Sequence, residues 1–300
     1  MKTRSLTEGA MLGAITVVVA IIGEYVGIPS VIVPVPLMLL VYRQGFRLGI
    51  LVAVAAALIS SLVAGHVFSG LTIIIWGFVG VAVGMALREK FSFPKLMVVG
   101  ILSNLVVIGL NFLLYSLIFG GNVFTDMLVM LNETIEQAIQ TSQSLGVTGQ
   151  ALQRYEDLRI FVPFIIKWGL PSLLLIYSVA MTYINLAVLR AVLKRMGESI
   201  PWVAPFTRWR LPAYYGLFLL FGLAITMWAQ VAVIPSWLQL IGVNVFIFVF
   251  HAYLVVGIGL AWYYFQKKNV PGFVRVILLF LLFTMEFLVM AVIFAAVIDG

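Results

Sequence analysis

The chain has 300 residues, of which 63% are hydrophobic and only 10% are charged, and its mean hydropathy is +1.16. This composition excludes a soluble globular domain. The chain has a formal net charge of +7 and no cysteine, so disulfides, thiolate chemistry and Cys-based metal sites are excluded.

Lys and Arg are concentrated in short loops between long apolar stretches. Fifteen of the 18 basic residues fall in five clusters, and the loops near Gly27, Gly65 and Pro235 carry none. Because basic residues of short loops stay in the cytoplasm during insertion, each cluster marks a cytoplasmic loop. This bias predicts contact with anionic lipid and not with nucleic acid. The clusters are Lys2/Arg4, Arg43/Arg47, Arg88/Lys90/Lys95, Arg190/Lys194/Arg195/Arg208/Arg210 and Lys267/Lys268/Arg275.

A helix of about 20 apolar residues crosses a bilayer. The sequence therefore predicts an all-α, polytopic transmembrane bundle of about nine spans, with a cytoplasmic N-terminus and an external C-terminus. The second span is short and contains Pro34 and Pro36, which indicates a full, kinked or re-entrant helix among the others. The predicted spans are 6–26, 31–42, 48–64, 68–87, 96–119, 161–189, 212–233, 237–265 and 273–298.

Small residues recur at close-packing spacing in the first span, as the pairs Gly9/Gly13 and Ala10/Ala14. Such stripes let helix backbones approach closely in lipid. Packing within the chain is the commoner role, and a face that docks on a partner subunit is the alternative.

A long segment with amphipathic spacing separates the fifth and sixth spans. Apolar residues recur at helical spacing from Phe124 to Ile139, Gly146 and Gly149 interrupt the pattern, and a second stretch begins at Leu152. We predict an external helical hairpin over residues 122–159 that lies on the membrane or over the bundle. A lid over a binding cavity and a passive loop both stay open as interpretations.

The loop over residues 194–211 contains Arg208, Trp209 and Arg210. A Trp beside Arg is typical of an anchor at headgroup level. We favour a loop that is anchored at the membrane surface over a docking site for a cytoplasmic partner.

Polar side chains inside the predicted spans are candidates for a small-solute site, because ionisable groups at membrane depth are costly. Glu286 and His251 lie mid-span and can pair if the last two spans are antiparallel neighbours. For the amides and hydroxyls, hydrogen bonds between helices, worth roughly 0.6–2 kcal/mol each, are the favoured role. The ligand-binding candidates are Glu24, Asn104, Asn111, Tyr115, Asn185, Asn244, His251 and Glu286; the docking candidates are Gly9, Ala10, Gly13, Ala14, Arg208, Trp209 and Arg210.

Signatures of enzymes are missing from the sequence. There is no Gly-Lys dipeptide for a phosphate loop, no HExxH motif and no G-x-S-x-G elbow. We therefore expect no enzyme activity, no cofactor and no metal site.

Three segments carry a resemblance to a known family: residues 3–10, Pro34 to Gly45, and Phe206 to Pro212. They resemble the YybS-like family, uncharacterised polytopic membrane proteins of Gram-positive and related bacteria. That family is in turn similar, chiefly in its first half, to the S components of energy-coupling factor transporters. The resemblance implies that a small molecule binds from outside and that small residues of the first helix dock on a transmembrane coupling subunit. Gly9, Ala10, Gly13 and Ala14 match that pattern loosely.

We thus expect an S-component-like part over residues 1–193 and a three-span part over 194–300. The predicted function is small-solute binding, or a transport-related role in the cell membrane, without an ATPase of its own. The alternative is a scaffold or assembly factor that recruits another membrane protein through its cytoplasmic loops. Transport predicts a polar cavity roofed by the hairpin, whereas a scaffold predicts a filled core and a partner face.

Overall fold

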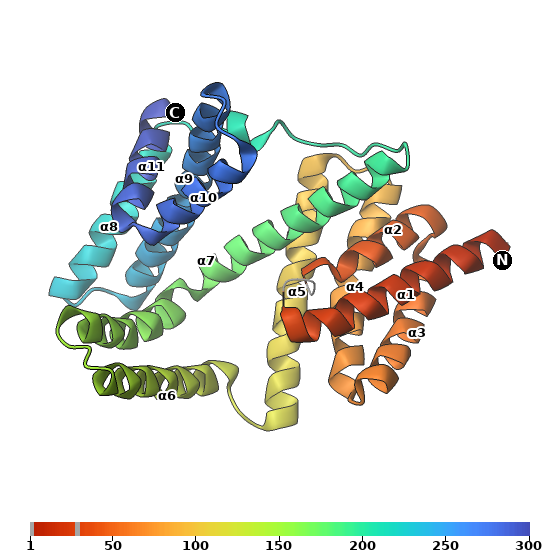
Figure 1. The fold of residues 1–300 in the computed structure, drawn as a ribbon, viewed down its shortest axis with the longest axis horizontal. Coiled ribbons are helices and arrows are strands. Elements are labelled where there is room, and N and C mark those ends of the chain that lie inside the picture. Colours follow the sequence, from red (N-terminus) through yellow and green to blue (C-terminus); the bar gives the residue numbers. More distant parts are fainter. Residues whose placement is uncertain (1–2, 28–30) are drawn as a thin grey trace. The chain divides into compact units, whose positions relative to one another are not determined.

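The computed structural model describes residues 3–27 and 31–300, and all regular structure within them is helical (Figure 1). The prediction of an all-α protein is confirmed. Six helices of this described part are long and apolar enough to cross a bilayer. They are α1 (Thr3–Val26), α3 (Phe46–Ala64), α4 (Val67–Arg88), α5 (Phe93–Phe119), α7 (Gln150–Arg195) and α9 (Ser236–Lys267).

The remaining elements are shorter. They are α2 (Pro34–Gln44), α6 (Val123–Ser144), the 3-10 turn η2 (Phe206–Arg208), α8 (Tyr215–Val231), α10 (Gly272–Thr284) and α11 (Glu286–Asp299). Each predicted span corresponds to a helix or a helix pair, but three are not simple spans. Helix α2 has only 11 residues, α8 has 17, and the ninth span is two helices bent by 105°.

The chain forms two compact units, which are described separately below. Unit 1 comprises residues 1–126 and 177–202, and unit 2 comprises residues 127–176 and 203–300. Helix α7 contributes its first part to unit 2 and its second part to unit 1. The sequence predicts a boundary near residue 193, which would place residues 127–176 in the first part of the chain and not with the C-terminal part. This boundary stays a prediction.

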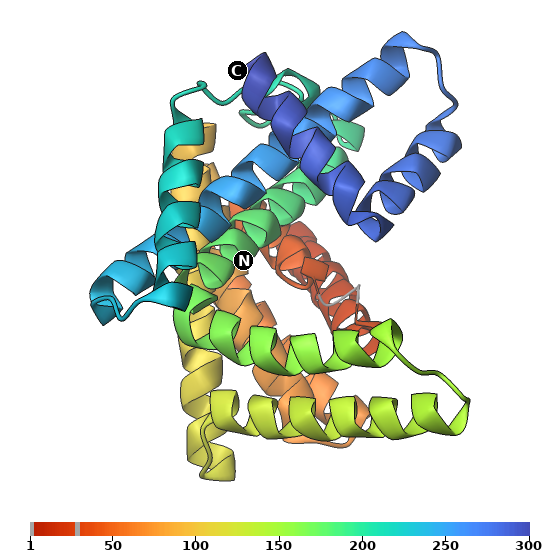
Figure 2. The same ribbon diagram turned by 90° about the vertical axis from the view of Figure 1, so that its left-hand side faces the viewer.

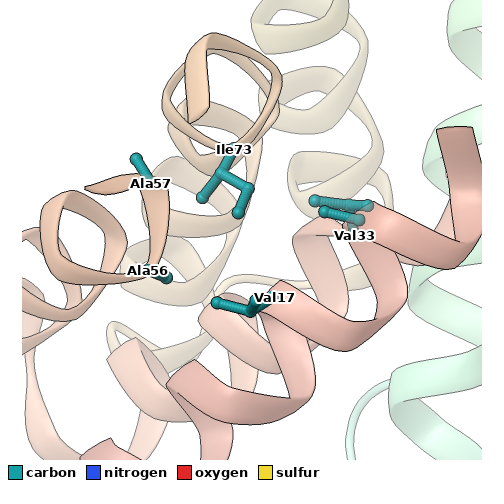
Figure 3. Packing of buried hydrophobic residues seen from close by; sticks show 6 residues of the cluster. Val17, Val33, Ala56, Ala57 and Ile73 are labelled. Atoms are coloured by element: carbon teal, nitrogen blue, oxygen red, sulfur yellow. The ribbon is translucent and has the colours of Figure 1, made fainter. Parts of the chain in front are cut away.

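Unit 1 is built around the short helix α2, which begins with Pro34 at a position where a helix needs no backbone N–H. All residues from Pro34 to Val41 are buried, so the predicted burial of the second span is confirmed. Glycines on α4 allow this close contact: a Cβ at Gly84 would lie 2.8 Å from the Met38 carbonyl oxygen. Beside α2, a core of Val17, Val33, Ala56, Ala57 and Ile73 joins α1, α3 and α4 (Figure 3).

Unit 2 packs α8 and α11 against α9. Gly222 of α8 faces the backbone of α9, because a Cβ there would lie 2.6 Å from the Phe246 nitrogen. About three turns further along α9, Gly257 lies against Val292 of α11. Helix α10 leads away from the end of α9 and α11 returns toward it, which Figure 2 shows as a V of blue ribbon. The two C-terminal helices thus fold as a pair instead of one straight span.

Candidate functional site

An open cleft of about 590 Å³ lies at the end of unit 1 where α1 begins and where α2 and α4 end. We call it the unit 1 cleft. Segments far apart in the sequence contribute to it, because the ends of four helices meet there. Its lining residues are Ser5, Glu8, Tyr42, Arg43, Gln44, Arg88, Lys90 and Glu198.

Both carboxylates of the unit 1 cleft are engaged by neighbouring donors. Glu8 forms an ion pair with Arg43, with 2.9 Å between Oε1 and Nη1, and it accepts a hydrogen bond of 2.6 Å from Gln44 Nε2. The Tyr42 hydroxyl donates a hydrogen bond to Glu198. Glu8 therefore has a cationic partner within the cleft, whereas Glu198 is bound by a neutral donor.

The other two cations of the cleft have no such partner. Within residues 3–27 and 31–300, neither Arg88 nor Lys90 forms an ion pair. Arg88 extends over Gly45, where a Cβ would lie 3.4 Å from its Nη1 atom. Lys90 adopts a left-handed conformation, with φ of +57°, two residues after the end of α4. That position normally favours glycine, so a lysine there is held at a cost in backbone energy.

The predicted ligand residues Asn104 and Asn185 are buried in a packed interface of unit 1. Asn104 Nδ2 donates to the Gly100 carbonyl oxygen at 2.9 Å and to Thr182 Oγ1 at 3.1 Å. Asn185 Nδ2 donates to the Met181 carbonyl oxygen at 2.8 Å. The Asn104–Thr182 bond joins α5 to the second part of α7, whereas the other two bonds each lie within one helix. The cross-helix bond favours the packing role over a solute site.

Glu24, Asn111 and Tyr115 each have a local partner in unit 1. Glu24 lies 3.6 Å from His66 Nε2, at the end of α1 remote from the unit 1 cleft. Asn111 Nδ2 donates to the carbonyl oxygen of Val107, and the Tyr115 hydroxyl donates to Asp126 Oδ2 at 2.9 Å. The proposed lid belongs largely to unit 2, so its placement over these residues stays a prediction.

Asn244 has a structural role in unit 2 that its sequence context does not reveal. Its Oδ1 accepts a hydrogen bond of 2.8 Å from the Ser172 N–H, and its Nδ2 donates to the Trp168 carbonyl oxygen at 2.6 Å. These two backbone groups would bond each other in an undisturbed helix. Pro171 disturbs α7 at this point. The Asn244 amide therefore bridges the opened turn and ties α7 to α9.

The last two ligand candidates lie on α9 and α11. His251 is half-buried, and its Nδ1 lies 2.7 Å from the Ile247 carbonyl oxygen, one turn earlier on the same helix. The side chain of Glu286 falls outside the described part of the structure. The predicted pairing of Glu286 with His251 therefore stays a prediction.

The small-residue stripe of α1 divides into two faces. Gly9 and Gly13 are buried against α3, where a Cβ would lie 3.3 Å and 2.9 Å, respectively, from Val52 side-chain atoms. Ala10 and Ala14 are exposed. The glycines thus pack within unit 1, and only the alanines remain available to a partner.

The Arg208–Arg210 segment packs against unit 2 itself. Trp209 Nε1 donates to the Ala204 carbonyl oxygen at 2.9 Å, and the indole packs on the core formed by α9 and α11. A second cleft of about 460 Å³, which we call the unit 2 cleft, lies beside this segment. It is lined by Thr207, Arg208, Trp209, Arg210, Leu260, Tyr263, Tyr264, Lys267 and Asp299.

The contact of Asp299 with Arg210 bears on the predicted topology. Their Oδ2 and Nε atoms are 3.2 Å apart, so both residues lie at the same end of unit 2. The sequence interpretation places Arg210 inside and Asp299 outside, on opposite sides of a hydrocarbon core about 30 Å thick. The contact disagrees with the predicted external position of Asp299, and the orientation itself stays a prediction. The physical reason is the bend between α10 and α11, which brings the chain back to the end where α10 began.

Sequence reasoning did not predict either cleft. It treats Arg88, Lys90 and Lys267 only as orientation signals and names Arg208 and Arg210 as docking candidates, because nothing in the sequence shows which loops meet. One local signal was present: Glu8 lies close to the basic N-terminal cluster and needs a partner.

The comparisons with known proteins agree with this architecture. The profile of a family described as predicted membrane protein (DUF2232) matches residues 11–300. The protein named "Uncharacterized protein YybS" from Bacillus subtilis (strain 168) is 21% identical over 218 residues, which cover 70% of this chain and 69% of the relative. The resemblance to the YybS-like family is thus confirmed. No solved structure matches the chain, so the similarity to S components stays a prediction. The chain belongs to the DUF2232 family of predicted membrane proteins.

Proposed function

We propose that this integral membrane protein binds a small anionic solute in the unit 1 cleft, in a transport-related role without an ATPase of its own. One observation carries the proposal. The cleft has the volume of a small-molecule site, its lining carries three positive charges against two negative ones, and among the described residues Arg88 and Lys90 form no ion pair. A carboxylate or phosphate on the solute would supply the missing partner.

The conformation of Lys90 supports a binding role for this residue. Left-handed backbone at a non-glycine residue costs of order 1–3 kcal/mol, and such residues cluster at ligand sites. A glycine at this position would relieve the strain but would remove the cation. Arg88 lies in the last turn of the same helix, and its planar guanidinium is suited to bidentate contact with a carboxylate or phosphate.

We also propose that the ends of the units that carry the clefts face the cytoplasm, because they carry the basic clusters. The N-terminus is then cytoplasmic. Asp299 is cytoplasmic as well, in place of the external position that the nine-span reading requires, since it pairs with Arg210.

The scaffold alternative receives less support from the contacts. It requires that the Arg208–Arg210 segment be free to recruit a partner, but Trp209 packs on the core of unit 2 and Arg210 pairs with Asp299. The exposed alanines of α1 remain compatible with docking on a coupling subunit, which a transport-related role also requires.

Thermal unfolding of the purified protein in detergent tests the binding proposal. Inorganic phosphate and citrate serve as probes, with chloride at equal ionic strength as the reference. We expect one of the two probes to raise the Tm saturably, because a ligand at 100 times its Kd adds about 2.7 kcal/mol of stability. Arg88→Gln and Lys90→Gln should abolish this increase.

Arg47→Gln provides the matched control, because Arg47 belongs to the same basic cluster as Arg43 but does not line the cleft. It should retain the full increase in Tm. The proposal fails if neither probe gives a saturable shift, or if Arg47→Gln loses the shift as completely as Arg88→Gln does.

A further inference from the structure

The unit 2 cleft combines cations with exposed aromatic side chains at the end of a membrane-spanning helix. Arg208, Arg210 and Lys267 line it together with Tyr263 and Tyr264. The only carboxylate among its lining residues is that of Asp299, so three cations face one anion within this part of the described structure. The cleft is therefore net positive.

The cations are held in place by the fold of the segment that carries them. The turn η2 lies so close to α9 that a Cβ at Gly259 would be 2.5 Å from the Phe206 carbonyl oxygen. The Phe206 ring also contacts the Trp262 ring, with 6.1 Å between centroids. Trp209 then anchors the far end of the turn in the core between α9 and α11. A rigid support of this kind lowers the entropic cost of binding an anion.

The depth of the cleft follows from helix α9. This helix is long and apolar enough to cross the bilayer, so we expect its last turn at the level of the lipid headgroups. Tyr263 and Tyr264 are 45% and 51% exposed there, as is typical of the aromatic belt at a membrane interface. Lys267 follows one turn later. A lipid phosphate lies at the same depth as these side chains.

Two of the three cations of this cleft have no anionic partner. Among the residues described, Arg208 and Lys267 form no ion pair, whereas Arg210 pairs with Asp299, with 3.2 Å between Nε and Oδ2. Two arginines can present several N–H donors to a phosphate, and an ammonium adds a point charge. The Asp299 carboxylate neutralises part of this positive charge and competes with an incoming anion.

We propose that the unit 2 cleft is a binding site for the phosphate of an anionic phospholipid in the cytoplasmic leaflet. Arg208, Arg210 and Lys267 contact the phosphate, Tyr263 and Tyr264 lie against the glycerol and upper acyl region, and Asp299 weakens binding as an internal competitor. This inference concerns unit 2 and does not depend on the anion site proposed in unit 1.

Native mass spectrometry of the full chain in detergent tests this site, with phosphatidylglycerol and phosphatidylcholine of identical acyl chains as probes. Selective retention of phosphatidylglycerol is expected. Lys267→Gln should weaken it about tenfold or more, since a hydrogen bond to a charged group contributes about 1.5–3 kcal/mol. Asp299→Asn should strengthen retention, because it removes the competing carboxylate while preserving the shape of the side chain.

Lys268→Gln is the matched control, because it removes the same charge one residue outside the cleft. It should leave retention of phosphatidylglycerol unchanged. Equal losses for Lys267→Gln and Lys268→Gln would overturn the proposal in favour of diffuse surface charge. Inorganic phosphate is the third arm: if it displaces phosphatidylglycerol at equal concentration, the site takes a soluble phosphate and the lipid assignment is wrong.

Discussion

At the level of single residues, Asn244 shows how a polar side chain inside a span can act as a structural bridge. We expect Asn244→Leu to destabilise the protein by about 1–3 kcal/mol, because the Ser172 N–H and the Trp168 carbonyl then lose their partner in an apolar setting. Asn111→Leu is the control, since Asn111 donates its hydrogen bond to Val107 of its own helix. Thermal unfolding in detergent measures both. Equal destabilisation by the two variants would contradict the bridging role.

The same residues show how far sequence reasoning reaches at this scale. Asn244 is recognisable as a polar group at membrane depth, but its partners lie 72 and 76 residues earlier in the chain. Nothing near Asn244 connects it with Pro171. Gly9 and Gly13, by contrast, could be predicted to pack, because the spacing of small residues alone defines a face on which a backbone can approach.

At the level of elements, the position of α2 depends on glycines of α4. A methyl group at Gly84 would lie 2.7 Å from Val41 Cβ and 2.8 Å from the Met38 carbonyl oxygen, so Gly84→Ala must push α2 away. We expect a loss of about 1–3 kcal/mol in stability. Gly109→Ala is the matched control: a methyl group there meets no atom within 4 Å. It should be neutral or stabilising by up to about 1 kcal/mol. Similar losses at both sites would show that α2 can shift freely.

The break between α10 and α11 marks the limit of prediction for elements. Residues 273–298 are almost uniformly apolar and contain neither Pro nor Gly, so local signals favour one straight helix. The bent pair instead follows from contacts made elsewhere. Gly257 lets α11 approach α9. At the end of α11, Gly300 lies against the Leu211 carbonyl group. Helix α2 could be anticipated as irregular, because its prolines are visible in the sequence.

At the level of the whole molecule, the number of helices follows from composition, but the number of crossings does not. Each predicted span has a counterpart among the helices described. The orientation rule fixes a crossing only when basic residues follow the span. No Lys or Arg follows Arg275, so the rule cannot distinguish a ninth crossing from a hairpin that returns to the cytoplasm. The Arg210–Asp299 pair supports the returning hairpin that we propose.

The absence of cysteine from this chain allows a clean test of that hairpin. Single cysteines at Ser236, Lys268 and Gly300 would be exposed to a membrane-impermeant thiol reagent in intact cells. Ser236 and Lys268 lie at opposite ends of α9, so they calibrate external and cytoplasmic reactivity. We expect Ser236→Cys to be labelled, and Lys268→Cys and Gly300→Cys to be protected until the membrane is permeabilised. A returning hairpin keeps Gly300 on the side of Lys268, because α11 reverses the path of α10. Labelling of Gly300→Cys in intact cells at the rate of Ser236→Cys would instead establish a ninth crossing, and the Arg210–Asp299 contact could not then form in the membrane.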